Sequence, residues 1–360
     1  MTAQNGLPAP AGGKPTVLHL GDPVEFGHEL YAQLQERFNV VRPTLEERQR
    51  PAFLRALREG KWGDFAAVFK PFWNTGGEMG RWDRELIPLL PPSFKVYAAA
   101  GAGFDWADVD VMAERGIIYC NGAGASTEAV ADMAVYHILS VFRNMQWSNM
   151  AARGGDPDAF LDAHRNAPVG ARNPAGHVLG VVGLGRIGQR AAQKAHAAFG
   201  MRIAYHDVAP RSAEQTAGLG ADLKGYDSLE EMLPHADCVL MAAPTQPDGK
   251  PILKRKHISI LKKGARVVNI GRGTLLDEEA LADALDSGAV YSAGLDVHAN
   301  EPHVSARLRA HRKVSLTSHT GGGALETTMG FEALSMQNVL AVLGGKKPLT
   351  PVNLHLFKKT

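Results

Sequence analysis

The chain has 360 residues, of which 45% are hydrophobic and 21% are charged, and its formal net charge is only +2. A chain of this length exceeds one ordinary hydrophobic core, so we expect a soluble globular protein of two domains. The near-neutral charge provides no electrostatic footprint for nucleic acid or for an anionic membrane surface, and no apolar run approaches the length that spans a bilayer.

Residues 1–14 are rich in Ala, Gly and Pro and lack the basic and apolar regions of a secretory signal. We interpret them as a disordered leader. The two cysteines, Cys120 and Cys238, each lie in an apolar strand-like segment, where a thiol is more often a small buried hydrophobe than a reactive group. Two thiols in so long a chain indicate a reducing compartment, so we expect a cytoplasmic protein.

The first third of the chain alternates short apolar runs with helical segments. Strands are predicted at 16–20, 39–41, 65–70, 94–100 and 116–120, and helices at 25–38 and 51–59. This alternation is typical of an α/β fold with a parallel sheet and crossover helices. Such a sheet binds ligands beyond the carboxyl ends of its strands, which singles out Lys70 and the glycine-rich turn 101–105.

A long helical pattern follows from Ser126 towards Met150, and residues 158–177, rich in Asn, Pro and Gly, are predicted to be irregular. A long helix followed by a loop is typical of a bridge between domains. The second domain is therefore expected to begin at about residue 148.

The second αβ series predicts a complete doubly wound domain. Its strands are expected at 179–182, 202–205, 238–242, 266–270, 292–296 and 314–317, with helices that include 228–233 and 277–287. A last helix, 325–343, has no strand after it, so the simplest path returns the chain to the first domain. We therefore expect two Rossmann- or flavodoxin-like parallel-sheet domains, with a cofactor domain (148–322) inserted into a discontinuous substrate domain (1–147 and 323–360).

A glycine-spaced turn between an apolar run and the helix-like segment 189–199 is the strongest single signal. Gly183, Gly185 and Gly188 form G-x-G-x-x-G, which provides a tight turn, close backbone approach to a pyrophosphate, and close packing of helix on strand. The helix N-terminus favours an anion through its free N–H groups and its dipole. This context favours a dinucleotide site over an ordinary turn between strand and helix.

The choice of dinucleotide depends on Asp207, which lies 19 residues after Gly188 at the end of a second apolar run. A carboxylate there accepts hydrogen bonds from an adenosine ribose and repels a 2′-phosphate, so NAD is predicted. Arg211, four residues further on, is the feature that could instead accommodate NADP.

Three later segments at strand ends contribute Arg272, Glu301 and His319. By the strand-end rule all three face the crevice that holds the nicotinamide. Arginine can grip a carboxylate and polarise a neighbouring carbonyl, and histidine can move the proton that accompanies a hydride. A glutamate beside the histidine favours the imidazolium and fixes its orientation. Each residue alone is more often a surface group, but together they are predicted to be catalytic.

Four motifs occur in a fixed order: G-L-G-R-I-G (183–188), N-I-G-R-G (269–273), G-L-D-V-x-x-x-E-P (294–302) and H-T-G-G (319–322). In this order and spacing the chain resembles the D-isomer-specific 2-hydroxyacid dehydrogenases. Within them it is most similar to the fungal D-mandelate dehydrogenases, in segments 98–106, 173–180 and 292–298. One departure is Ser318, which replaces the proline that commonly precedes the family histidine.

The resemblance implies roles for the substrate site. Arg272 would bind the substrate's carboxylate and carbonyl, and His319, paired with Glu301, would donate the proton in reduction. The amides of Ala102 and Gly103 would hold the carboxylate from the other domain.

The resemblance also assigns cofactor-binding residues, namely Gly183, Gly185, Arg186, Ile187, Gly188, Asp207, Ile270, Gly271, Asp296, Gly321 and Gly322. Asp296 would accept from the nicotinamide carboxamide. Lys70 and Trp106 are added as pocket residues from their positions in the sequence. For Lys70, a solvated lysine at a strand end is an equal alternative.

The function implied by the resemblance is NAD-dependent interconversion of D-2-hydroxy acids and 2-keto acids, with D-mandelate and benzoylformate as the expected pair. Glyoxylate, hydroxypyruvate or a branched 2-keto acid remain alternatives, because the aromatic residues near the strand ends can either rim the crevice or fill the core. A formate dehydrogenase would pair its histidine with glutamine, so Glu301 speaks against it. An NAD-sensing scaffold like the C-terminal-binding-protein corepressors keeps the same three residues, but no long charged or low-complexity tail is visible.

The expected partners are a small-molecule acid and a second copy of the chain, with no nucleic acid, membrane or metal. Members of the resembled family are usually dimers joined through the cofactor domain. The segment 126–153 and the loop that follows it are candidates for that contact.

Overall fold

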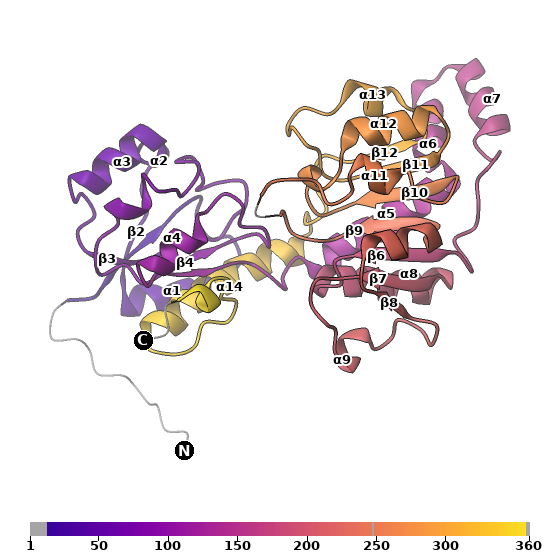
Figure 1. The fold of residues 1–360 in the computed structure, drawn as a ribbon. Helices are drawn as coiled ribbons and strands as arrows, with labels where there is room; N and C mark the ends of the chain where they lie inside the picture. Colours follow the sequence, from indigo (N-terminus) through magenta and orange to yellow (C-terminus); the bar gives the residue numbers. More distant parts are fainter. Residues whose placement is uncertain (1–12, 247, 358–360) are drawn as a thin grey trace. The chain divides into compact units, whose positions relative to one another are not determined.

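The computed structural model describes residues 13–246 and 248–357, and its contacts divide the chain into two units (Figure 1). Unit 1 comprises residues 1–126 and 323–360, and unit 2 comprises residues 127–322. This arrangement confirms the expected fold class, in which one α/β domain is inserted into another. The sequence expectation divided the chain after residue 147, whereas the contacts divide it after residue 126. Most of the expected leader, 1–14, lies outside the described residues.

Unit 1 is built on a five-stranded sheet in the order β2-β1-β3-β4-β5, in which all neighbouring strands are parallel. This is the flavodoxin-like doubly wound order. The strands are β1 (Thr16–His19), β2 (Asn39–Val41), β3 (Phe65–Lys70), β4 (Val96–Ala99) and β5 (Ile118–Cys120). The helices are α1 (His28–Arg37), α2 (Leu45–Arg48), α3 (Arg50–Arg58), α4 (Val109–Glu114) and α14 (Leu325–Leu343), with short 3₁₀ turns η1 (Ile87–Leu89) and η4 (Leu354–Leu356).

The central strand β3 is buried along its whole length, because helices and loops cover both faces of the sheet. Alternate residues of the strand enter different cores. Val68 packs with aromatic residues such as Tyr97 and Trp82 on one face. Phe69 packs on the other face with apolar residues of α14, including Met336. The C-terminal helix α14 therefore completes the core that the N-terminal segment begins (Figure 1).

A buried carboxylate ties the two segments of unit 1 together. Glu332 of α14 is fully buried, and its two oxygens accept hydrogen bonds from the backbone N–H groups of Glu25, Phe26 and Gly27 at 2.7, 3.0 and 2.7 Å. These N–H groups lie in the loop that leads into α1, so one side chain satisfies three backbone donors. Such bonds to a charged acceptor are stronger than bonds to a neutral one.

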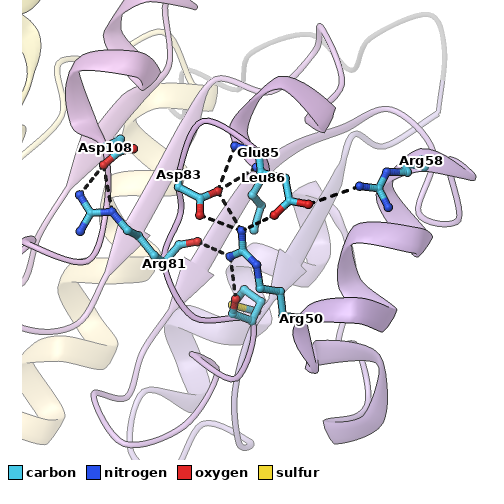
Figure 2. A network of polar contacts seen from close by, with 8 residues as sticks. Arg50, Arg58, Arg81, Asp83, Glu85, Leu86 and Asp108 are labelled. Atoms are coloured by element: carbon cyan, nitrogen blue, oxygen red, sulfur yellow. Dashed lines mark hydrogen bonds and ion pairs between the residues drawn. The ribbon is translucent and has the colours of Figure 1, made fainter.

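Arg50, at the start of α3, organises the loop between β3 and η1 (Figure 2). Its guanidinium donates to the carbonyls of Met79 and Arg81 at 3.1 and 2.7 Å, and it pairs with the carboxylates of Asp83 and Glu85 at 2.7 and 2.9 Å. A planar group with five donors can satisfy several acceptors of one loop at once. The loop is therefore fixed although it has little regular structure.

The same loop supports the glycine-rich turn 101–105. Arg81 donates to the carbonyl of Asp105 at 2.6 Å. Figure 2 shows its ion pair with Asp108. Trp82 adds a backbone hydrogen bond from its N–H to the carbonyl of Trp106 at 3.0 Å. Polar contacts from the loop between β3 and η1 thus hold the C-terminal end of the turn that follows β4.

Unit 2 is built on a seven-stranded parallel sheet in the order β12-β11-β10-β9-β6-β7-β8. This is the Rossmann order, in which the order of the strands along the sheet reverses between β6 and β9. The strands are β6 (Val178–Val182), β7 (Arg202–His206), β8 (Lys224–Tyr226), β9 (Cys238–Met241), β10 (Ala265–Asn269), β11 (Val290–Leu295) and β12 (Val314–Leu316). The helices are α5 (Thr127–Arg143), α6 (Met145–Gly154), α7 (Pro157–Asn166), α8 (Arg186–Phe199), α9 (Ala213–Thr216), α10 (Leu229–Met232), α11 (Arg255–Ile258), α12 (Glu278–Asp286) and α13 (Ala306–Ala310).

Three details of unit 2 differ from the sequence prediction. The helix expected from Ser126 towards Met150 is broken at Asn144, which has a left-handed φ of 52° and donates from its amide to the Ala167 carbonyl and the Tyr291 hydroxyl. The irregular segment expected at 158–177 contains most of α7, which starts at an Asp156 cap followed by proline, a usual beginning of a helix. The short edge strand β8 was not predicted, because its three residues carry no clear apolar alternation.

In the part of the chain that the structure describes, no helix is long and apolar enough to cross a membrane. The described residues also contain no group of three or more His, Cys, Asp and Glu side chains arranged to hold a metal ion. Cys120 and Cys238 are both free and buried. Burial raises the pKa of each thiol to about 12, which keeps both in the unreactive protonated form.

Replacement of Glu332 tests whether its carboxylate holds the two segments of unit 1 together. Glu332→Leu should lower the free energy of unfolding by about 2–4 kcal/mol, because it leaves three backbone donors without a partner. Glu332→Gln should cost less, because its amide oxygen can still accept. Urea unfolding followed by circular dichroism measures both. Equal losses for the two variants would contradict this account.

Candidate functional site

The glycine-spaced turn joins β6 to α8, and two of its glycines are required by close packing. Gly183 has a φ of +91°, and a side chain there would meet the backbone of Ala243 at 2.8 Å. A side chain at Gly188 would collide with the carbonyl oxygen of Gly183. Gly185 differs, because a β-carbon there would have no neighbour within 4 Å. The turn is therefore closely packed at Gly183 and Gly188, whereas the space at Gly185, before the first turn of α8, is open.

The N-terminus of α8 suits a pyrophosphate. Gly185 is its N-cap, no side chain caps it, and its first turn holds no acidic residue. Arg186 adds a positive charge at the first helical position, while Ile187 packs on the core below. Unsatisfied N–H groups, the helix dipole and an arginine all favour an anion in the open space.

Asp207 follows β7 and lies against the glycine turn. Its carboxylate accepts from the N–H groups of Leu184 and Ala209 at 2.7 and 3.0 Å and forms an ion pair with Arg211. Burial alone would raise the pKa of Asp207, but Arg211 and the two N–H groups hold that pKa below its ordinary value. The group is therefore a fixed carboxylate at the end of the strand next to the turn.

Arg272 follows β10 in a segment held by Asn269. The fully buried amide of Asn269 accepts from the Gly271 N–H at 3.1 Å and donates to the carbonyl of Arg272 at 2.8 Å. Gly271 is required here, because a side chain would meet the carbonyl oxygen of Ala243 at 2.8 Å. Ile270 is buried beside it. The segment after β10 therefore packs closely against the segment that follows β9.

Glu301 and His319 form a hydrogen-bonded pair after the adjacent strands β11 and β12. The Nδ1 atom of His319 lies 2.8 Å from Oε2 of Glu301, and the side chains are 44% and 35% exposed. His319 has a left-handed φ of 55°, which is uncommon for a residue with a side chain. Such backbone strain is often found at functional sites. The pair leaves Nε2 of His319 as the nitrogen available to a substrate.

Asp296 holds the segment that carries His319. Its side chain accepts from the Thr317 hydroxyl at 2.6 Å and from the N–H groups of Thr320 and Gly321 at 3.0 and 2.9 Å. Its own carbonyl accepts from the N–H of His319 at 2.8 Å. Because Asp296 is only 2% exposed and three of its about four acceptor positions are in use, its main contacts are with this segment. Gly321 is required because a β-carbon would lie 2.6 Å from the carboxylate, and Gly322 follows it, partly exposed.

In unit 1, Ala102 and Gly103 lie in the turn after β4. Gly101 adopts a φ of +90°, the Ala102 carbonyl accepts from the Asn121 amide at 2.7 Å, and the Gly101 carbonyl accepts from the N–H of Gly122 at 2.7 Å. Among the described residues, the N–H groups of Ala102 and Gly103 have no acceptor. A pair of successive N–H donors can bind an anion.

Lys70 ends β3 and is 7% exposed. Its ammonium donates to the Trp73 carbonyl at 3.4 Å and lies 5.7 Å from the ring centre of Trp106. Burial lowers the Lys70 pKa to about 8, and the charge of Glu78 partly opposes this effect. The alternative of a solvated lysine is therefore wrong. Trp106 itself packs against the buried ring of Tyr119, with part of its surface exposed.

Sequence reasoning missed four residues that hold the site together: His137, Asn269, His298 and Thr317. Asn269 was visible in the N-I-G-R-G motif, as the last residue of a strand followed by a tight turn. His298 lies between Asp296 and Glu301 and could have been noted for that reason. The contact of His137 on α5 with Thr317 joins residues 180 positions apart, so no local pattern reveals it.

A family model described as "D-isomer specific 2-hydroxyacid dehydrogenase, NAD binding domain" matches residues 135–321. Among solved structures, the holo form of D-mandelate dehydrogenase from Rhodotorula graminis is 44% identical, with a TM-score of 0.90 over 94% of this chain and 97% of that chain. A glyoxylate reductase from Paecilomyes thermophila is 31% identical, with a TM-score of 0.84 over 94% of this chain and 98% of that chain. The 4-methyl-2-oxopentanoate reductase A of Aspergillus oryzae is 34% identical over 84% of this chain and 88% of its own length.

The ion pair between Asp207 and Arg211 generates a prediction about the dinucleotide. The intact protein should prefer NADH to NADPH in kcat/KM, because Asp207 repels a 2′-phosphate. Asp207→Ala releases the Arg211 guanidinium, so the ratio of kcat/KM for NADH to that for NADPH should fall by about tenfold or more. The double variant Asp207→Ala with Arg211→Ala is the control and should lose this gain for NADPH. An unchanged ratio in Asp207→Ala would contradict the assignment.

Proposed function

The chain belongs to the D-isomer specific 2-hydroxyacid dehydrogenases, and we propose that it reduces 2-keto acids to D-2-hydroxy acids, with benzoylformate and D-mandelate as its preferred pair. As a member of this family it is an NAD-dependent oxidoreductase of 2-hydroxy acids. The observation that carries the proposal is the His319–Glu301 pair, held at the end of the sheet whose glycine turn fits the dinucleotide.

His319 is the proposed acid–base group. Bound NADH supplies the hydride for the keto carbon. His319, protonated and held through Nδ1 by Glu301, donates a proton from Nε2 to the developing alkoxide. The carboxylate of Glu301 stabilises the imidazolium and fixes the ring. In the oxidative direction neutral His319 accepts the hydroxyl proton.

The substrate's carboxylate is proposed to bind cations and amide donors. Arg272 offers a planar guanidinium that binds a carboxylate through two hydrogen bonds and polarises the adjacent carbonyl. The N–H groups of Ala102 and Gly103, together with the buried ammonium of Lys70, are the proposed contributions of unit 1. Gly321, Gly322, Ile270 and Asp296 are proposed to line the nicotinamide.

The preference for an aryl keto acid is supported by two observations. The related D-mandelate dehydrogenase of Rhodotorula graminis is 44% identical over nearly the whole chain. Trp73, three residues after β3, is 62% exposed and is available to an aryl group, whereas Phe104 and Trp106 pack against Tyr119. A panel of benzoylformate, 4-methyl-2-oxopentanoate, hydroxypyruvate and glyoxylate with NADH tests the choice. If one of the other three acids has a higher kcat/KM, that acid replaces benzoylformate as the proposed substrate.

We also propose that two copies associate through α6 and α7. Met150, Phe160 and Leu161 are large apolar side chains on these helices and are exposed. Large exposed apolar side chains on two helices in contact favour an interaction surface. Light scattering of the purified protein tests the proposal, and Leu161→Glu should favour the monomer.

A cytoplasmic location is proposed from the two free, buried thiols.

Removal of the proposed acid–base group should abolish most turnover. His319→Ala should lower kcat for keto-acid reduction by about 10²–10⁴-fold while leaving NADH binding, measured by fluorescence, close to that of the intact protein. His355→Ala, in the exposed turn η4 of unit 1, is the matched control and should retain activity. With the intact protein, hydride transfer should fall with rising pH in reduction and rise with pH in oxidation. Identical pH profiles in both directions would exclude the role of His319.

The lowered pKa of Lys70 leads us to expect a second pH effect, on substrate binding. Because the Lys70 pKa is lowered to about 8, its ammonium is present below pH 8 and is lost as the pH rises through that value. The KM of the keto acid should therefore increase above pH 8, by up to about tenfold. Lys70→Arg keeps its charge and should remove this increase, whereas Lys70→Met should have a high KM at every pH. A Lys70→Met variant that keeps the original KM profile would refute the assignment.

A further inference from the structure

Thr317, two residues before His319, is held by two buried histidines. His298 lies in the segment after β11, and its Nε2 atom is 2.8 Å from the carbonyl oxygen of Thr317. His137 comes from α5, and its Nε2 atom is 3.0 Å from the Thr317 hydroxyl. That hydroxyl also lies 2.6 Å from Asp296. The main chain and the side chain of one residue are thus each bonded to a histidine.

The partners fix which nitrogen carries the proton in each ring. A carbonyl oxygen only accepts, so Nε2 of His298 must donate to Thr317. The Thr317 hydroxyl has one hydrogen and gives it to the carboxylate of Asp296, so Nε2 of His137 must donate as well. In both rings, therefore, Nε2 carries a proton. In both, Nδ1 is buried and has no partner among the described residues.

An unpartnered buried nitrogen is unfavourable, and an apolar side chain would fill either place without it. The hydrogen bond donated by Nε2 is therefore the reason that a histidine, and not an apolar residue, occupies each position. For His137, burial lowers the pKa to about 4, with Asp296 opposing and His298 adding to the effect. A neutral ring that donates one hydrogen bond is a stable, fixed support at neutral pH.

His298 also touches the two other parts of the proposed active site. Its backbone N–H donates to Oε1 of Glu301 at 2.9 Å, while Oε2 of the same carboxylate binds His319. Its carbonyl carbon and oxygen press against Gly273, where any side chain would collide with them. Gly273 directly follows Arg272. One residue is therefore in contact with the segments that carry all three proposed catalytic groups.

We propose that His298 is a positioning residue for the His319–Glu301 pair, and that His137 supports the same point of the chain through the Thr317 hydroxyl. The inference rests on the proposed function, since it describes how the acid–base group of that function is held. The Nε2–H of His298 fixes the main chain two residues before His319, while its backbone N–H fixes Glu301. The ring of His319 is then left with one orientation towards the substrate, although its backbone has an unfavourable φ.

Two matched variants of His298 test the proposal. The amide nitrogen of His298→Gln can replace the Nε2 donor, whereas His298→Leu fills the space without a donor. His298→Leu should lower kcat for keto-acid reduction by about 10²-fold, because small misplacements of a reacting group cost rates of this order. The dissociation constant of NADH should stay within about twofold, since the donor does not serve the glycine turn. His298→Gln should recover most of the lost kcat.

The Thr317 hydroxyl tests the second support. Thr317→Val removes the acceptor of His137 and a donor to Asp296 with little change in shape, whereas Thr317→Ser keeps the hydroxyl. The valine variant should lose kcat with NADH binding retained, and the serine variant should remain close to the intact protein. If His298→Leu does not fold, this pair still decides whether contacts at Thr317 act on catalysis.

Nitrogen-15 NMR of the intact protein provides a readout that needs no activity. At pH 7 the Nε2 atom of both His298 and His137 should carry a proton, and the ring of His137 should be neutral because burial lowers its pKa. An Nε2 atom without a proton on His298, or a His298→Leu variant with unchanged kcat, would overturn the proposal. Equal kcat for the leucine and glutamine variants would do so too. If the intact protein reduces no keto acid, the proposed function fails, and the tautomers still report whether the two histidines hold Thr317.

Discussion

The parallel register of β10, β11 and β12 is the constraint on which the proposed chemistry depends. Asn269 pairs with Leu295, and Leu295 pairs with Leu316, so the three strands end on one line across the sheet. The strands themselves are almost entirely buried, which fixes this register, because a slip of one residue would turn every side chain to the opposite face. The polar groups then come directly after the last paired residues. An apolar interior thus determines where Glu301 meets His319.

Beyond the strand ends, buried hydrogen bonds oppose backbone strain. A left-handed residue with a side chain is disfavoured by about 1–2 kcal/mol, and His319 is such a residue. Its N–H is bonded to the Asp296 carbonyl, and the next two N–H groups are bonded to the Asp296 carboxylate. These bonds stabilise the unfavourable conformation. The site therefore combines a buried, hydrogen-bonded support with a half-exposed imidazole, which suits the proposed proton transfer to a small molecule.

Much of this could be predicted from the sequence, because the signals are local. Apolar runs located all strands of both sheets except β8, and the glycine spacing located the turn before α8. The strand-end rule selected Arg272, Glu301 and His319 without coordinates. The errors have physical reasons. Asn144 breaks a periodic helix because Tyr291 and the Ala167 carbonyl bind its amide, and such long-range partners leave no local mark. The hydrogen bond made by His137 is equally invisible, since a buried histidine has the same sequence pattern whether or not it has a partner.

The interleaved order of the two units has a consequence for synthesis on the ribosome. Translation completes all of unit 2 before it reaches α14, whose Met336 and Val339 fill one core of unit 1. Until then the apolar face of β3 and β4 lacks the cover that α14 provides, and the N–H groups near Glu25 lack their acceptor. The nascent N-terminal segment is therefore the aggregation-prone part of the chain, because it stays incomplete while a later segment folds.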